Sequence, residues 1–139
     1  MATSALHIAA AVIFSVDSKT LLVRKRGSPF FMQAGGKIEP GEQPLAALIR
    51  ELGEELGLVV ELQQARWLGR FGAPAANEPG LHVEAELFEI AGRGDVTIGA
   101  EIDEITWIDP WAPGSLKLAP LTRGTILPLC QALLRDRAG

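Results

Sequence analysis

An apolar run near the N-terminus, Leu6–Val16, predicts a buried β-strand. The polar residues 17–19 predict a turn, and Leu21–Arg26 alternates well enough to predict a second strand that pairs back as a hairpin. The Pro- and Ala-rich segment Ala73–Gly80 predicts a loop. Four further stretches have the length and composition of strands: Val59–Leu62, Ala65–Phe71, Leu81–Ile90 and Ile105–Ile108.

Apolar residues at helical spacing predict a helix over Leu45–Leu56. Pro44 suits the first position of this helix and Gly57 suits its C-terminal cap. A closing helix is predicted over Leu121–Arg135, kinked or shortened by Pro128. Strands around two helices in this order predict an α/β fold, with a mixed sheet covered on both faces.

Composition narrows the class of protein. A length of 139 residues fits one domain, and 47% hydrophobic with 22% charged residues is ordinary for a globular protein. A net charge of −4 argues against a general nucleic-acid binder, because phosphate backbones recruit basic surfaces. The single cysteine, Cys130, excludes an internal disulfide, and the apolar run Ile8–Val16 is too short to span a bilayer. We therefore expect a cytoplasmic protein without membrane or nucleic-acid partners.

The predicted helix over Leu45–Leu56 carries an unusual surface. Glu51, Glu54 and Glu55 fall on the side opposite the apolar stripe, within an arc of about 100°. The helix contains no Lys, Arg50 is its one cation, and a glycine at position 53 costs about 1 kcal/mol relative to alanine. A solvated acidic face is one interpretation. The other is a metal site, since Mg²⁺ prefers hard carboxylate oxygens.

The residues around this helix follow a longer pattern. Gly36 is followed by five residues and then Glu42, and seven residues later comes the run Arg50-Glu51-Leu52-Gly53-Glu54-Glu55-Leu56-Gly57-Leu58. This resembles the Nudix box, G-x5-E-x7-R-E-U-x-E-E-x-G-U with U aliphatic, at every fixed position. Seven identities at average residue frequencies have a chance on the order of 10⁻⁸ per starting position. The match therefore favours the metal-site interpretation.

The resemblance implies an α/β/α sandwich with a mixed central sheet, in which residues 1–139 form one Nudix domain and the box forms a loop–helix–loop. It implies hydrolysis of a nucleoside diphosphate linked to another moiety, X, with Mg²⁺ or Mn²⁺. Many relatives carry proline where this chain has Ala34, which puts the geometry at the loop's entry in question. By position, the metal would be held by Glu51, Glu54 and Glu55, together with the backbone of Gly35 and Gly36.

The same resemblance assigns the supporting residues. Arg50 would orient the glutamates through a salt bridge, Glu42 would brace the loop against the helix, and Gly57 would end the helix. Glu51 or an acid from a later loop would assist the attacking water. Glu101 is slightly favoured over Glu104 for that acid, and a solvent-exposed acidic loop is the alternative for both.

Substrate contacts outside the box are less specific. Arg24 and Arg26, in the basic cluster 24–26, could meet phosphates, although charges on an edge strand that discourage aggregation explain them as well. Phe31 could stack on a base, whereas core packing of Phe30 and Phe31 is the competing interpretation.

Features outside the box rank the candidate substrates and the alternative functions. The compact length favours MutT-like enzymes that act on (d)NTPs. An ADP-ribose or nucleotide-sugar pyrophosphatase comes second, because Pro74 lies sixteen residues after Leu58 and resembles a mark of ADP-ribose hydrolases. A non-catalytic nucleotide-sensing Nudix module, or an isopentenyl-diphosphate isomerase using Cys130, are remote alternatives. The apolar strands and three tryptophans allow a homodimer without requiring one.

Overall fold

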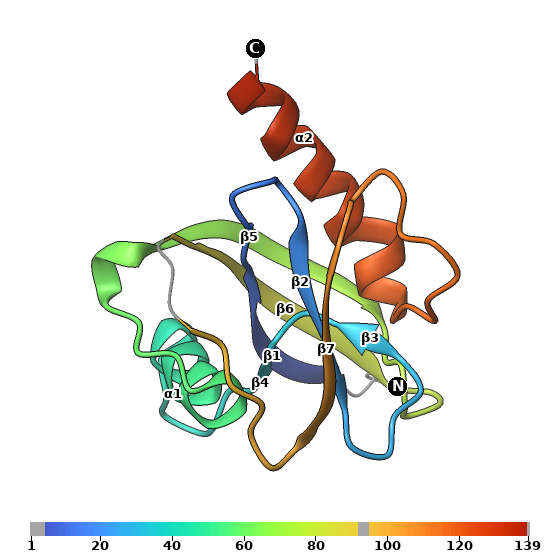
Figure 1. Cartoon of the computed structure of the whole chain (residues 1–139). Helices are drawn as coiled ribbons and strands as arrows, with labels where there is room; N and C mark the ends of the chain where they lie inside the picture. The colour runs from blue at the N-terminus through green and yellow to red at the C-terminus, as the bar shows by residue number, and fades with distance from the viewer. Residues whose placement is uncertain (1–4, 92–94, 139) are drawn as a thin grey trace.

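The computed structural model describes residues 5–91 and 95–138, and its strands form two sheets (Figure 1). The larger sheet has the order β4-β1-β6-β5, and the smaller has the order β3-β2-β7. β1 runs parallel to β6 and antiparallel to β4, so the larger sheet is mixed. The strands are β1 (Ala5–Val12), β2 (Thr20–Lys25), β3 (Phe31–Met32), β4 (Gly35–Lys37), β5 (Ala65–Pro74), β6 (His82–Ile90) and β7 (Ile102–Ile108).

The predicted hairpin between the first two strands exists only at its turn. Ser15 N–H donates to the Lys19 carbonyl at 2.8 Å, and Leu21 N–H donates to the Ile13 carbonyl at 3.1 Å. Beyond this turn the strands diverge, because β1 pairs with β4 and β6 while β2 pairs with β3 and β7. The hairpin prediction was therefore wrong for most of its length. Strand β1 ends at Val12, and its last four residues are buried, as expected for a strand covered on both faces.

Helix α1 (Pro44–Leu56) packs against strands of both sheets. Its buried apolar residues pack in one cluster with side chains from β1, β2, β6 and β7. Gly57 caps the helix in the left-handed conformation, with φ of 66°. Both the extent and the cap of this helix agree with the sequence prediction. The helix residues of this core are Ala47, Leu48, Leu52 and Leu56.

The opposite side of the sheets is covered by the C-terminal segment. A π-helical turn (Thr122–Ile126) leads into α2 (Leu127–Ala138), so the irregular turn precedes Pro128, which lies in the first turn of α2. Cys130 is fully buried against the face of the larger sheet opposite α1, and burial raises the pKa of its thiol to about 11. The expected α/β class and the cover on both faces are confirmed, although the strands form two sheets rather than one central sheet.

The remaining differences lie at element boundaries. Val59–Leu62 is not a strand: Val59 is 91% exposed, and a short 3₁₀ helix (Leu62–Gln64) follows. The strand expected to end at Phe71 continues to Pro74, and β7 begins at Ile102, three residues before the predicted start. Within residues 5–91 and 95–138, no helix is long and apolar enough to cross a membrane.

Candidate active site

The two glycines of β4 bring backbone directly against the acidic face of α1. Gly35 has φ of +145°, and a Cβ there would collide with the Ala9 carbonyl on β1. A Cβ on Gly36 would lie 2.5 Å from Oε2 of Glu51. Only residues without a side chain allow β4 to pass between β1 and the helix. The Gly35–Gly36 backbone therefore lies directly beside Glu51 of the acidic face.

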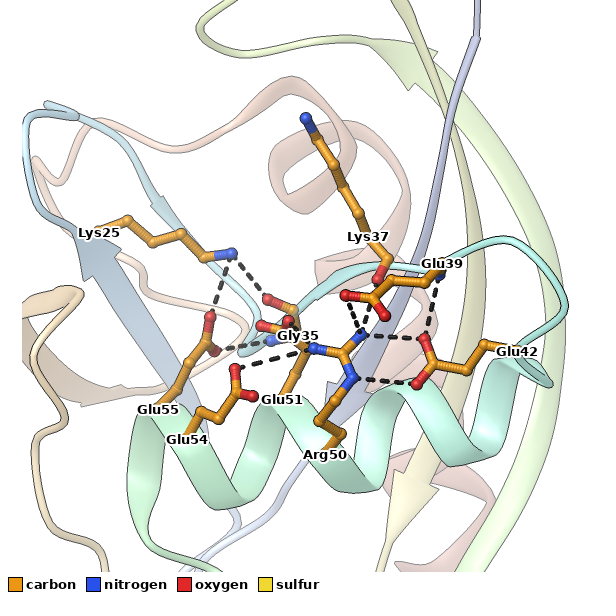
Figure 2. A network of polar contacts seen from close by, with 9 residues as sticks. All are labelled: Lys25, Gly35, Lys37, Glu39, Glu42, Arg50, Glu51, Glu54 and Glu55. Carbon is orange, nitrogen blue, oxygen red and sulfur yellow. Dashed lines mark hydrogen bonds and ion pairs between the residues drawn. The ribbon is translucent and has the colours of Figure 1, made fainter.

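Arg50 joins the box loop to the helix (Figure 2). Its Nε and Nη2 donate to the two carboxylate oxygens of Glu42, both at 2.9 Å, and Nη1 donates to Glu51 Oε1 at 2.7 Å. Nη2 also donates to the Lys37 carbonyl at 3.2 Å. Such a two-pronged contact fixes orientation as well as charge. Arg50 and Glu42 thus make the contacts that the resemblance to the box implies.

Glu42 is held as a carboxylate by this contact. The Arg50 guanidinium, and the Glu39 N–H that donates to Glu42 Oε1 at 3.0 Å, lower the pKa of Glu42 to about 2. Glu42 follows the turn at residues 40–41, so its ion pair with Arg50 fastens that turn to the second helical turn of α1.

Glu55 is buried, whereas a glutamate on the acidic face of the helix was expected to be exposed. The residue is only 4% exposed, because it turns under β4 rather than outward. Gly35 N–H donates to its Oε1 at 3.0 Å, and Lys25 Nζ lies 3.2 Å from its Oε2. Burial raises the pKa of Glu55, and the Lys25 ammonium and the Gly35 N–H oppose that rise without cancelling it. A buried carboxylate with these two partners is a specifically built feature of the site.

The sequence placed Lys25 only in the basic cluster 24–26, and its contact with the box was not predicted. It lies at the end of β2, and its Nζ donates to the Gly35 carbonyl at 2.7 Å as well as contacting Glu55. Alternation along a strand sends Lys25 to the face opposite its neighbours in the basic cluster, and the pairing of β2 with β7 shifts register between Arg24 and Lys25. The alternation was available in the sequence, whereas the partner on α1 was not.

The three box glutamates are neighbours on α1 with different surroundings. Glu54 has an exposed side chain and lies 3.7 Å from Arg50, while Glu51 is held by Arg50 and Glu55 by Lys25 and Gly35. In the part of the chain that the structure describes, no group of three or more Asp, Glu, His or Cys side chains already lies close enough together to hold a metal ion. The donor set nevertheless fits Mg²⁺, since carboxylates and a backbone carbonyl are hard oxygen ligands. A cation, the Lys25 ammonium, already lies beside the carboxylate of Glu55 and the carbonyl of Gly35.

A loop before β7 closes the C-terminal end of α1. Thr97 N–H donates to the Leu56 carbonyl at 2.9 Å, and Gly99 N–H donates to the Glu55 carbonyl at 2.8 Å, which satisfies the last turn of the helix. Glu101 follows with an exposed side chain, and its carbonyl accepts the Arg26 N–H. This loop is thus tied to the box helix next to Glu55. Glu104 belongs to β7 rather than to the loop, contrary to its predicted place.

The candidate substrate contacts have partners within the protein. Arg24 lies 3.4 Å from Asp103 and 3.3 Å from Glu104, and Arg26 lies 3.9 Å from Asp103. The Arg24 pairs join β2 to β7, and the Arg26 pair joins the turn after β2 to β7, which supports a structural role for both arginines. Phe31 is 6% exposed and belongs to a core cluster, so its position favours packing over base stacking.

A cavity of about 200 Å³ adjoins the glycine backbone. Its lining includes Lys25, Gly35 and Gly36, together with the amide-bearing residues Gln33 and Asn77. A larger cavity, about 420 Å³, is lined by Gly57 and Leu58 at the C-terminal end of the box. Neither lining includes a box glutamate, but the smaller cavity is lined by Gly35 and Gly36, whose backbone packs against Glu55 and Glu51. Apolar side chains complete its lining, among them Leu6, Ile8, Met32, Val83 and Leu121.

Comparison with known proteins agrees with the box and the fold. The family described as NUDIX domain matches residues 5–130, and the chain therefore belongs to the Nudix family. The crystal structure of the MutT protein from Methanosarcina mazei Go1 superposes with a TM-score of 0.76 at 18% identity, covering 100% of this chain and 99% of that one. That likeness establishes the fold, and the resemblance to MutT-like Nudix hydrolases is confirmed.

Two curated relatives are more similar in sequence. The chain is 36% identical over 108 residues to a Myxococcus xanthus protein named octanoyltransferase, covering 75% of this chain and 29% of that protein. It is 33% identical over 111 residues to the ADP-ribose pyrophosphatase of Methanocaldococcus jannaschii, covering 75% of this chain and 63% of that enzyme. The chain thus spans less than two thirds of the length of either relative.

Proposed function

We propose that the chain catalyses divalent-metal-dependent hydrolysis of a phosphoric anhydride bond in a nucleoside diphosphate linked to X. The observation that carries this proposal is the packing of Gly35 and Gly36 against Glu55 and Glu51. It combines carboxylates with backbone that a phosphate chain can approach without meeting a Cβ. A helix needing only a solvated acidic face would have no use for a buried, hydrogen-bonded Glu55.

Each residue of the candidate active site has a proposed role in hydrolysis. Glu51, Glu54, Glu55 and the Gly35 carbonyl would hold the metal. When bound, Mg²⁺ supplies positive charge to the phosphate oxygens and makes the attacking water more acidic. Arg50 keeps Glu51 oriented through its 2.7 Å contact, and Glu51 or Glu101 accepts the proton of the water as it attacks phosphorus.

We propose a nucleoside triphosphate as the substrate. The cavity of about 200 Å³ beside Gly35 and Gly36 is smaller than the ~300–1,000 Å³ of typical sites for drug-sized ligands. It suits one base, and its lining includes Gln33 and Asn77, whose amide type is the one that hydrogen-bonds a base edge. Tri- and diphosphate oxygens would then extend toward the glutamates.

ADP-ribose or a nucleotide sugar is the second candidate. One curated relative is named ADP-ribose pyrophosphatase, and Pro74, the residue that resembles an ADP-ribose mark, lines the same cavity. For these substrates the second sugar would extend beyond the cavity.

A panel of (d)NTPs, ADP-ribose and nucleotide sugars, assayed with Mg²⁺ and with Mn²⁺ and with products identified by mass, tests both proposals. Nucleoside monophosphate plus pyrophosphate from (d)NTPs supports the first. Turnover confined to ADP-ribose or nucleotide sugars, giving two monophosphates or a sugar phosphate with a nucleotide, replaces it with the second. Binding of nucleotides without metal-dependent turnover of any of them would leave a nucleotide-sensing module and overturn both.

A further inference from the structure

The Lys25 ammonium lies between two oxygens of the candidate metal site. Its Nζ is 2.7 Å from the Gly35 carbonyl oxygen and 3.2 Å from Glu55 Oε2 (Figure 2). The two oxygens come from β4 and α1, and the lysine reaches them from β2. Three elements therefore meet at one positive charge.

The groups around the Lys25 ammonium show the role of its positive charge. Glu55 is 4% exposed, and a buried carboxylate without a partner is costly. The Gly35 N–H satisfies Oε1, which leaves Oε2 for the ammonium. Lys25 is thus the counter-ion of Glu55, and it also satisfies a backbone carbonyl that the proposed function assigns to the metal.

We propose that Lys25 is a built-in stand-in for the metal ion, holding Glu55 and the Gly35 carbonyl in place until a divalent cation displaces it. This inference rests on the proposed function, because it takes those two oxygens as metal ligands. A divalent cation and an ammonium cannot share the same two oxygens, since both are strongly hydrated positive charges that repel at contact distance.

The lysine side chain is able to leave. It is 33% exposed, and its four-carbon stem has freely rotating bonds. Lys25 also lines the cavity beside Gly36, so the displaced ammonium has a place near where substrate phosphates would lie. Lys25 is therefore a positioning residue for the metal ligands, and its presence weakens the affinity for the metal.

Metal affinity in Lys25→Met tests the inference. Lys37→Met is the matched control: Lys37 is exposed, follows Gly36 directly, and its ammonium points away from the glutamates in Figure 2. Both variants remove one positive charge near the site, but only Lys25→Met removes the competitor. Titration with Mn²⁺, followed by the electron paramagnetic resonance signal of the free ion, should give a Kd roughly 10-fold lower for Lys25→Met than for Lys37→Met.

Unfolding midpoints in EDTA and in saturating Mn²⁺ provide a second readout. Lys25→Met should lose more stability than Lys37→Met in EDTA and recover it in Mn²⁺, because the metal then neutralises Glu55. If Lys25→Met does not fold without metal, Lys25→Gln, which keeps a hydrogen-bond donor, takes its place in both measurements. Equal Kd values for the Lys25 and Lys37 variants, or weaker binding by the Lys25 variant, would overturn the inference.

The outcome separates this inference from the proposed function. If the wild-type protein binds Mn²⁺ and hydrolyses its substrate while loss of Lys25 leaves the Kd unchanged, only the stand-in role fails. If neither the wild-type protein nor any variant binds Mn²⁺, both the inference and the proposed metal dependence fail.

Discussion

Gly36 and Glu51 are packed so closely that a methyl group on the glycine would lie 2.5 Å from the glutamate's carboxylate carbon and from its Oε2. The contact joins the loop and the helix of the Nudix box at the acid that Arg50 also holds. It makes the position of Glu51 sensitive to a single added carbon.

Gly36→Ala is therefore expected to lower kcat at least about 10-fold, because Glu51 must move away from the added methyl group. The fold should survive, since the atoms in the way belong to a side chain rather than to packed backbone. Steady-state kinetics and thermal unfolding of the same preparation check this. Wild-type kcat in a folded Gly36→Ala protein would show that the position of Glu51 is unimportant.

Glu51→Gln and Glu55→Gln should each reduce kcat by at least about 10²-fold, because each removes a negative charge proposed to face the metal while keeping the shape of the side chain. Glu39→Gln is the matched control: Glu39 belongs to the same network, but its exposed carboxylate lies 3.9 Å from Arg50. That variant should keep kcat within about 3-fold of wild type. Near-normal kcat in both box variants would refute the metal-site assignment.

Gly53→Ala should stabilise the protein by about 1 kcal/mol, because glycine lowers the stability of an exposed helix interior by roughly that amount. A Cβ at this position would meet only the Leu58 carbonyl at 3.7 Å, an ordinary contact. Urea unfolding monitored by circular dichroism measures the change. A destabilised variant would mean that the helix needs glycine at position 53 for a reason outside its packing.

The Glu42–Arg50 pair should make stability depend on pH in a defined window. The pKa of Glu42 is lowered to about 2 in the folded protein from its ordinary value of 4.5, so the pair's contribution is complete above pH 4.5 and is lost as pH falls toward 2. The difference in unfolding free energy between wild type and Glu42→Gln, measured in EDTA, should therefore shrink from pH 5 to about pH 2.

Glu78→Gln is the control for that titration, since Glu78 is an exposed acid in the loop before β6. Its difference from wild type should stay small across the range. A Glu42→Gln difference that stays constant down to pH 2 would show that the ion pair contributes nothing through the charge of Glu42.

Much of the box was predictable because its signals are local. The apolar spacing of α1, Pro44 at its start and Gly57 at its end depend on near neighbours in the chain, and the structure follows them. The contacts of Arg50 with Glu42 and Glu51 are likewise within one loop and helix. In these places sequence separation is short and the geometry of the helix determines what meets.

Features that depend on long-range pairing were not predictable. Leu6–Val16 and Leu21–Arg26 read as one hairpin, because nothing in either segment says that β4 and β6 take both edges of β1. The burial of Glu55 has the same origin: helical geometry places it with Glu51 and Glu54, and only the β4 backbone and Lys25 cover it. The strand predicted over Val59–Leu62 was wrong for a different reason: Val59 is exposed, and apolar composition alone does not distinguish a strand from a surface turn.

The parallel pairing of β1 with β6 also bears on how the protein reaches its working form. Ala5–Val12 aligns with His82–Ile90, so the centre of the larger sheet is completed only when the chain has emerged past its ninetieth residue. Gly35 and Gly36 depend on β1 for their place, and β1 depends on β6. A nascent or truncated chain ending at Leu58 would carry every residue of the box and still lack a site, so catalytic competence should appear late in folding and together with the whole sheet.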